Sequence, residues 1–168
     1  MNKFILGIGL IFLSCVQNQK KEIQESTPEV NYIYEATYLD TFKIGKPELV
    51  LIVQKMHQHI ILKEYDKAGS YLAENVVFAL EDGSQIEGKE KCINFMKDVY
   101  SSLEIQDYKV AVNLAVTGDN GDEWVLLWDN ANVVTESEEA TSFNWMEAFQ
   151  FINGKIVFMN QFSKPRLN

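Results

Sequence analysis

Residues 143–163, FNWMEAFQFINGKIVFMNQFS, decide the fold because they predict a β-hairpin with strands rich in aromatic residues. Asn153-Gly154 lies between the two apolar runs, and this dipeptide favours the positive φ values of a type I′ turn. A two-residue turn places Ile152 opposite Lys155 and thereby fixes the remaining cross-strand neighbours. The predicted pairs on one face are Phe151 with Ile156, Phe149 with Phe158, Glu147 with Asn160, and Trp145 with Phe162. That face is apolar except for one carboxylate and one amide, which indicates the wall of a pocket.

The first 15 residues have the order of a secretory signal. Lys3 precedes an apolar run over residues 4–13, which is too short to cross a bilayer as a helix. The segment Phe12-Leu13-Ser14-Cys15 resembles the lipobox of bacterial lipoproteins, in which the cysteine is diacylated and becomes the new N-terminus. The resemblance implies a signal peptide over residues 1–14 and a membrane anchor on Cys15. The alternative is an ordinary secretory signal with an incidental cysteine.

The residues after Cys15 predict where the protein is held. Val16 follows the cysteine, and no aspartate resembles an inner-membrane retention signal, so an outer-membrane position in the bacterial cell envelope is predicted. Residues 15–29 are the lipidated cysteine and a polar, flexible tether. Residues 30–46 contain several aromatic side chains, and we expect an ordered arm that packs against the domain, partly as a strand. The folded domain is predicted over residues 47–168.

The charge balance excludes several classes of function. The chain has 15 basic and 24 acidic residues, a net charge of −9, and no basic stripe, so nucleic acid is not expected as a partner. Two histidines, one cysteine besides Cys15, and the lack of a glycine-rich phosphate loop give no signature of a metal, nucleotide or other cofactor. Cys92 belongs to a helical apolar pattern, which predicts a buried structural thiol.

The order of elements predicts an α+β fold, with helices segregated from an antiparallel sheet. Pro47 opens a long helix to Ile61 in which His57 lies inside the apolar arc and His59 lies outside it. The apolar run at residues 123–134 is expected to be a central strand covered on both faces. The other predicted elements are a helix within residues 64–75, a short strand at 76–80 after it, a turn at 81–84, a helix from 89 to about 103, a strand at 109–118, and an acidic loop at 135–139.

Several motifs between residues 47 and 163 resemble the nuclear transport factor two-like superfamily, which includes SnoaL-like and ketosteroid isomerase-like proteins. They are Asp66-x-Ala68-x-x-Tyr71-Leu72-Ala73-Glu74-Asn75-Val76-Val77-Phe78, the Asp82-Gly83 turn, Gly88-Lys89-Glu90 and Asn153-Gly154-Lys155-Ile156. The resemblance implies a cone, in which a curved antiparallel sheet wraps around a long N-terminal helix with two shorter helices. It also implies an apolar cavity and a homodimer through the outer face of the sheet. The Trp124-Val125-x-x-Trp128 strand and the aromatic arm resemble small lipoproteins of Bacteroidota-type bacteria.

Two groups of residues are candidates for the site. Superfamily enzymes use a carboxylate or a histidine to move a proton, and Glu147 and His57 are the catalytic candidates because burial would raise the pKa of Glu147 toward that of a useful general base. Only one of Asp129 and Asn130 can face the cavity, since adjacent strand residues point to opposite faces. The candidate ligand-binding residues are Trp124, Trp128, Trp145, Phe149, Phe158 and Asn160.

Two functions follow from these candidates. The favoured one is a non-catalytic lipoprotein that binds a small apolar ligand or a partner protein. The alternative is an isomerase, cyclase or dehydratase with Glu147 or His57 as general base. A desolvated Glu147 in contact with His57 would favour the enzyme, whereas a cavity filled by Trp and Phe side chains would favour the binding protein.

Overall fold

The computed structural model describes residues 32–36, 38, 41–135 and 140–166. The chain divides into a unit that ends at Glu35 and a compact unit from Ala36 to Asn168, and the second unit holds all of the described helices and strands. Cys15, the predicted tether and residues 136–139 of the acidic loop lie outside the described residues. Among the described residues, no helix is long and apolar enough to cross a membrane.

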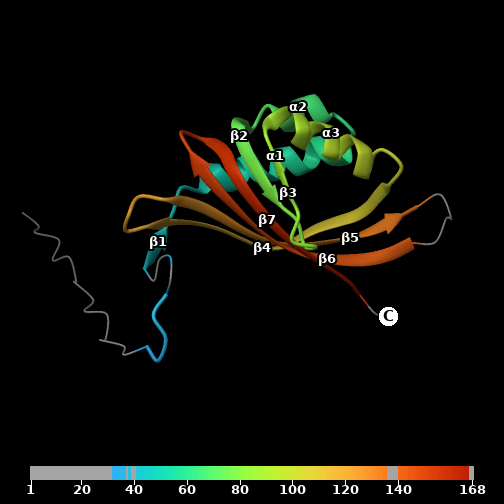
Figure 1. The fold of residues 1–168 in the computed structure, drawn as a ribbon. Helices are drawn as coiled ribbons and strands as arrows, with labels where there is room; N and C mark the ends of the chain where they lie inside the picture. The colour runs from blue at the N-terminus through green and yellow to red at the C-terminus, as the bar shows by residue number, and fades with distance from the viewer. Residues whose placement is uncertain (1–31, 37, 39–40, 136–139, 167–168) are drawn as a thin grey trace, which may run out of the picture. The chain divides into compact units, whose positions relative to one another are not determined.

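Three helices form one layer of the unit (Figure 1). Helix α1 (Pro47–Ile61) begins at the predicted proline, α2 spans Tyr65–Gly69, and α3 spans Lys89–Tyr100 after Gly88, whose φ is 95°. The second helix was predicted to be longer, but it ends at Gly69. The Ile93 side chain of α3 lies only 2.3 Å from the place where a Cβ of Gly69 would be, so the two helices approach as closely as a glycine permits.

Seven strands form one sheet in the order β1-β4-β5-β6-β7-β2-β3. Their bounds are β1 Phe42–Ile44, β2 Leu72–Ala79, β3 Gln85–Glu87, β4 Glu104–Gly118, β5 Glu123–Val134, β6 Ala140–Ile152 and β7 Lys155–Pro165. The four long strands β4 to β7 are antiparallel neighbours, as predicted. The sheet is mixed rather than antiparallel throughout, because β2 pairs with β7 in parallel. Most of the domain separates β2 from β7 in sequence, so no tight hairpin fixes their relative direction.

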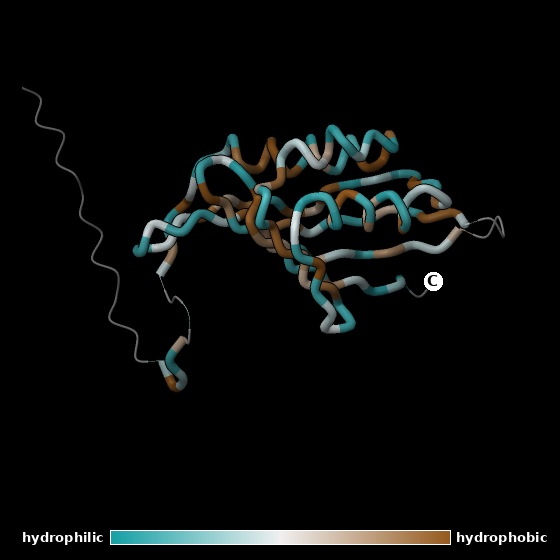
Figure 2. Tube along the Cα trace, turned by 45° about the horizontal axis from the view of Figure 1, so that its top comes forward, coloured by the Kyte–Doolittle hydropathy of each residue, from teal (hydrophilic) through white to brown (hydrophobic). Residues whose placement is uncertain are grey.

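All three helices cover the same face of the curved sheet, and the core lies between the two layers (Figures 1 and 2). Fully buried side chains from α1, β2, β5 and β6 meet there, among them Val53, Val76, Val125 and Phe149. Cys92 is buried as predicted, and burial raises the pKa of its thiol to about 11, which suits a structural role.

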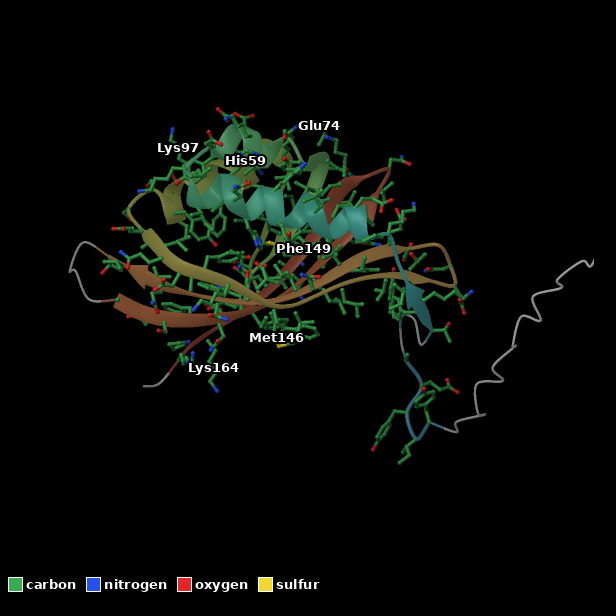
Figure 3. All side chains as sticks on the ribbon, turned by 180° about the vertical axis from the view of Figure 1, so that it is seen from behind. His59, Glu74, Lys97, Met146, Phe149 and Lys164 are labelled. Atoms are coloured by element: carbon green, nitrogen blue, oxygen red, sulfur yellow. The ribbon has the colours of Figure 1, made fainter. Side chains whose placement is uncertain are left out.

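None of the helices in the described part of the chain lies on the other face of the sheet. Strand β5 is central, as predicted, but its residues alternate between buried and half-buried. The expectation that both faces of β5 are covered is therefore wrong for the outer face. The sequence of β5 is nearly all apolar because large side chains such as Trp124 and Trp128 occupy the outer face as well. Figure 3 shows the two sides of the sheet, with Phe149 under α1 and Met146 on the opposite side.

A β-bulge changes the predicted register of the hairpin. Ile152 pairs with Lys155 and Phe151 with Ile156, as predicted, but the next pair joins Gln150 to Phe158. Val157 is the extra residue, so every later residue of β7 is displaced by one position. Phe149 consequently pairs with Met159, Glu147 with Gln161 and Trp145 with Ser163, and the predicted pairs with Phe158, Asn160 and Phe162 are wrong.

Candidate active site

A small chamber of about 60 Å³ lies between the helices and the inner face of the sheet. A groove of about 390 Å³ adjoins the chamber beside α3, and five residues line both spaces. The shared residues are Phe95, Tyr100, Ile105, Trp145 and Gln161. The chamber itself is walled by apolar and aromatic side chains, and its polar lining comes from His57, Tyr100, Tyr108, Asp129, Glu147 and Gln161. This combination of an apolar wall with a few converging polar groups is typical of an active site.

His57 enters the chamber from α1, on the face that also buries Val53 and Met56. Its Nδ1 lies 2.7 Å from the hydroxyl of Tyr108, and its Nε2 lies 3.2 Å from Oε2 of Glu147. The ring also packs edge-on against Phe149. The imidazole is thus held at both nitrogens and along one edge, and it joins the helix to two strands of the sheet.

Glu147 projects into the chamber from the inner face of β6, and only 7% of its surface is exposed. The amide Nε2 of Gln161 donates a hydrogen bond of 2.7 Å to Oε1. Oε2 has no hydrogen-bond partner among the described residues, although it faces His57. Burial raises the pKa of this carboxyl from 4.5 to about 7. The predicted amide partner, Asn160, lies on the other face because of the Val157 bulge.

Asp129 is the second buried carboxylate, so it is Asp129 and not Asn130 that faces the chamber. The Tyr108 hydroxyl donates a hydrogen bond of 2.6 Å to Oδ2, whereas Oδ1 has no hydrogen-bond partner among the described residues. Burial, together with the charge of Glu147, raises the pKa of Asp129 to about 6. Burial and the charge of Asp129 also raise the pKa of Tyr108, so the phenol keeps its proton.

Tyr108 and Gln161 were missed at the sequence level because bulges bring both into the chamber. Tyr108 follows Asp107, whose φ is 53°, at a point where the pairing of β4 with β5 shifts by one residue. An aspartate tolerates this left-handed conformation better than most residues, so Asp107 near the start of a strand was the available signal. Tyr100, at the end of α3, was also missed, and burial raises its pKa to about 12.

The hydrogen-bond network assigns the protons. Tyr108 donates to Asp129, so its oxygen can accept the Nδ1 hydrogen of His57. Burial lowers the pKa of His57 despite the nearby charge of Asp129, so the ring is neutral and Nε2 carries a lone pair. That lone pair faces an oxygen of Glu147, and one proton shared between these two atoms satisfies both. The site therefore holds one exchangeable proton between Glu147 and His57.

The same three side chains could also approach a metal ion. His57, Asp129 and Glu147 offer one nitrogen and two oxygens within 4.8 Å of one another. Imidazole and carboxylate groups are common ligands of divalent cations. The shared proton accounts for the short distance between His57 and Glu147 without such an ion, and removal of metal by a chelator separates the two interpretations.

The predicted ligand-binding residues fall on both sides of the sheet. Trp145 lines the chamber and the groove, and Phe149 lies on the same inner face. Trp128 pairs with Met146, on the outer face. Trp124 and Phe158 are in edge contact with each other there, with Tyr38 against Trp124. Trp124, Trp128, Phe158 and Asn160 are therefore excluded from the chamber, because the strand period of two places them on the opposite face.

Solved structures with the same fold include several enzymes. No protein-family model and no curated protein matches the sequence. An epoxide hydrolase of the LEH-like type from M. tuberculosis has a TM-score of 0.57 at 14% identity, with 70% of this chain and 83% of that chain covered. A proposed ketosteroid isomerase from Kribbella flavida has a TM-score of 0.57 at 12% identity, covering 74% and 84%.

A proposed polyketide cyclase from Xanthomonas campestris has a TM-score of 0.55 at 18% identity, with 67% of this chain and 87% of that chain covered. These likenesses establish the nuclear transport factor two-like fold, with an α+β architecture and an open mixed sheet, as the sequence motifs indicated. At such low identities they establish the fold alone, so the function has to be argued from the site.

Proposed function

We propose that this protein is an enzyme that transfers a proton within a small, largely apolar substrate, as an isomerase does. The single observation that carries the proposal is the position of Glu147, a buried carboxyl with a free oxygen 3.2 Å from Nε2 of a neutral His57. A pKa of about 7 allows the carboxyl both to accept and to return a proton near neutral pH. This contact is the one that favours catalysis over the non-catalytic binding function.

The residues around the chamber suggest a role for each group in such a reaction. Ionised Glu147 removes a proton from a carbon next to a carbonyl, and the electron pair of the C–H bond moves into the carbonyl to give an enolate. The protonated hydroxyl of Tyr100 can donate to the enolate oxygen, since burial keeps it neutral. Where the substrate has a C=C bond next to that carbon, the electron pair extends over it, and Glu147 returns the proton to the far carbon of the double bond. The double bond thereby moves into conjugation with the carbonyl, the substrate is isomerised, and the enzyme regains its starting state.

His57 and Tyr108 act on Glu147 and Asp129 in this scheme. His57 presents a lone pair to Glu147 and so stabilises the protonated carboxyl that forms in mid-reaction. Tyr108 holds the His57 ring through Nδ1 and directs its own proton to Asp129. Both are therefore positioning residues, because they act through the carboxylates.

Exchange of carbon-bound hydrogen with solvent tests the proposal directly. A panel of small apolar ketones, with and without an amino group, is incubated with the protein in D₂O, and loss of the α-proton signal is followed by ¹H NMR. We expect exchange of at least one ketone, slowed about 100-fold or more in Glu147→Gln. Glu87→Gln, at an exposed position on β3, is the matched control. Exchange that survives in Glu147→Gln would refute the role of this residue, and a lack of exchange with every ketone would favour the binding function.

We propose further that this enzyme is an envelope lipoprotein. The support is the lipobox-like segment that ends at Cys15, the polar residues 16–29 behind it, and the absence of a retention-type aspartate after the cysteine. Acyl chains on Cys15 would anchor the protein in the outer membrane, at about 0.8 kcal/mol per buried methylene group.

We also propose that a second copy of the chain covers the outer face of the sheet. Val112, Trp128, Met146 and Phe162 are cross-strand neighbours and make an apolar row over four strands. Val112, Met146 and Phe162 are 45%, 51% and 57% exposed, although they lie in the middle of the sheet. A two-fold contact through this row would remove the exposed apolar surface from water.

A further inference from the structure

The charged side chains that line the chamber and the groove are acidic. Among the described residues that line them, none is a lysine or an arginine. The charged groups are instead Asp129 and Glu147 in the chamber, with Glu81 and Asp82 along the groove. A carboxylate or phosphate on a substrate would meet like charge here and find no cation to bind.

Asp129 has an acceptor that the protein leaves unused. Only 4% of its surface is exposed, and Tyr108 occupies Oδ2, but Oδ1 has no hydrogen-bond partner among the described residues. A buried carboxylate oxygen without a donor is costly, and a donor on a ligand removes that cost. Oδ1 of Asp129 therefore offers a free lone pair to a donor that enters the chamber.

Aromatic side chains line the chamber that this carboxylate faces. Tyr100, Tyr108 and Trp145 all line the chamber, together with Phe95 at the side of α3. The face of an aromatic ring attracts a cation within about 6 Å, and the attraction is strongest where water is excluded. A carboxylate and aromatic rings in one chamber, with a neutral histidine and no lysine or arginine among the described lining residues, are the chemistry that recognises an organic cation.

We propose that the substrate of this chamber is a small amine, whose ammonium group donates to Oδ1 of Asp129 and lies against the aromatic wall. This inference rests on the proposed function, because it names the substrate class of the same site. The two carboxylates then have different roles. Asp129 binds the charge, and Glu147, which shares its proton with His57, remains free for proton transfer.

The dimensions of the two spaces limit the rest of the substrate. A chamber of about 60 Å³ holds the ammonium group and the reacting carbons but not a whole ring system. The adjoining groove of about 390 Å³ is lined by apolar residues such as Val99, Leu103 and Phe143, and it can hold an apolar body. The substrate is thus an amine with an apolar tail that extends along α3.

Three ligands of matched shape and different charge test this inference by isothermal titration calorimetry on the unaltered protein. They are 2-phenylethylamine as the cation, 2-phenylethanol as the neutral molecule, and 3-phenylpropanoate as the anion. We expect the amine to bind about 10-fold or more tightly than the alcohol, a difference of the size expected for one desolvated charge pair, and the anion not to bind detectably. Equal affinities for the amine and the alcohol, or tighter binding of the anion, would overturn the inference.

Asp129→Asn keeps the size of the side chain and removes its charge. We expect the preference for the amine over the alcohol to fall to about twofold or less in this variant, since the ammonium loses its ionic partner. Asp98→Asn, on the exposed side of α3, makes the same change of net charge away from the chamber and should retain the preference. A preference retained in Asp129→Asn would assign amine binding to another group and refute the proposal. If that variant does not fold, the three-ligand comparison on the unaltered protein still decides.

The exchange assay separates this inference from the proposed function. Glu147-dependent exchange of neutral ketones, without any preference for the amine ligand, would leave proton transfer standing and remove the amine. Tight, Asp129-dependent binding of the amine without exchange of any ketone would support amine binding and refute proton transfer. The chamber would then be a binding site for amines.

Discussion

Replacing Glu147 with Gln should change how the stability of the protein depends on pH. The pKa of this carboxyl is about 7 in the folded protein, against an ordinary value of 4.5. The folded state therefore binds the proton more tightly than the unfolded chain does, and its stability falls as the pH rises from 4.5 through 7. The difference between 7 and 4.5, multiplied by about 1.4 kcal/mol per pH unit, is about 3.5 kcal/mol in total, of which about 3 kcal/mol falls between pH 4.5 and pH 8.5. Glutamine has the same shape as glutamate and does not titrate. The stability of Glu147→Gln should therefore not fall in this way as the pH rises.

Urea unfolding at a series of pH values measures the effect. Between about pH 4.5 and pH 8.5, the free energy of unfolding of Glu147→Gln should rise by about 3 kcal/mol relative to that of the parent protein. Asp129, with a pKa raised to about 6, contributes a loss of the same sign. The variant keeps the part of this loss that comes from burial, which is the larger cause, and so keeps some pH dependence. The control Glu87→Gln should run parallel to the parent. Parallel curves for Glu147→Gln as well would show that the carboxyl is not buried as described.

Four further results are expected. Phe149→Ala should cost about 3 to 5 kcal/mol of stability in urea unfolding, whereas Phe158→Ala should cost clearly less because its ring is only half-buried; equal costs would contradict the observed register. Cys15→Ser should move the protein from the membrane fraction to the soluble one, and unchanged partitioning would refute lipidation. Met146→Glu should convert a dimer to a monomer in analytical ultracentrifugation, and a monomeric parent protein would refute the dimer. Dialysis against EDTA should leave the α-proton exchange unchanged, and activity restored only by a divalent metal would assign the chamber to a metal ion.

Much of the fold follows from local sequence patterns. Pro47, the apolar arc behind it and the Asn153-Gly154 turn each specify an element without help from the rest of the chain, and all three are observed. The parallel contact of β2 with β7 is different, because it depends on how the helical layer returns the chain to the sheet edge. The close approach of α3 to Gly69 of α2 also depends on tertiary packing, since the side chain of Ile93 lies where a larger side chain at position 69 would be.

The site was harder to predict because side-chain faces alternate with a period of two residues. One inserted residue reverses the face of everything after it. Nothing in the sequence marks Val157 as a bulge, and the only local signal for the bulge in β4 is the aspartate at position 107. Glu147 was placed on the inner face correctly, since it precedes the turn by a regular strand. Its partner was assigned wrongly, because the bulge lies between the turn and Gln161.

The change in functional conclusion comes from one contact that no local pattern specifies. The sequence places His57 in an apolar arc of α1 and Glu147 on an aromatic face of β6, and each alone is most simply a structural group. Their meeting at 3.2 Å depends on where α1 crosses the sheet. Once they meet, desolvation lowers the proton affinity of the imidazole and raises that of the carboxyl, so two groups with different ordinary pKa values become able to share a proton. Two buried polar residues thereby become a candidate acid–base pair. Asp129, whose Oδ1 has no partner among the described residues, is then the group proposed to bind the ammonium of the ligand.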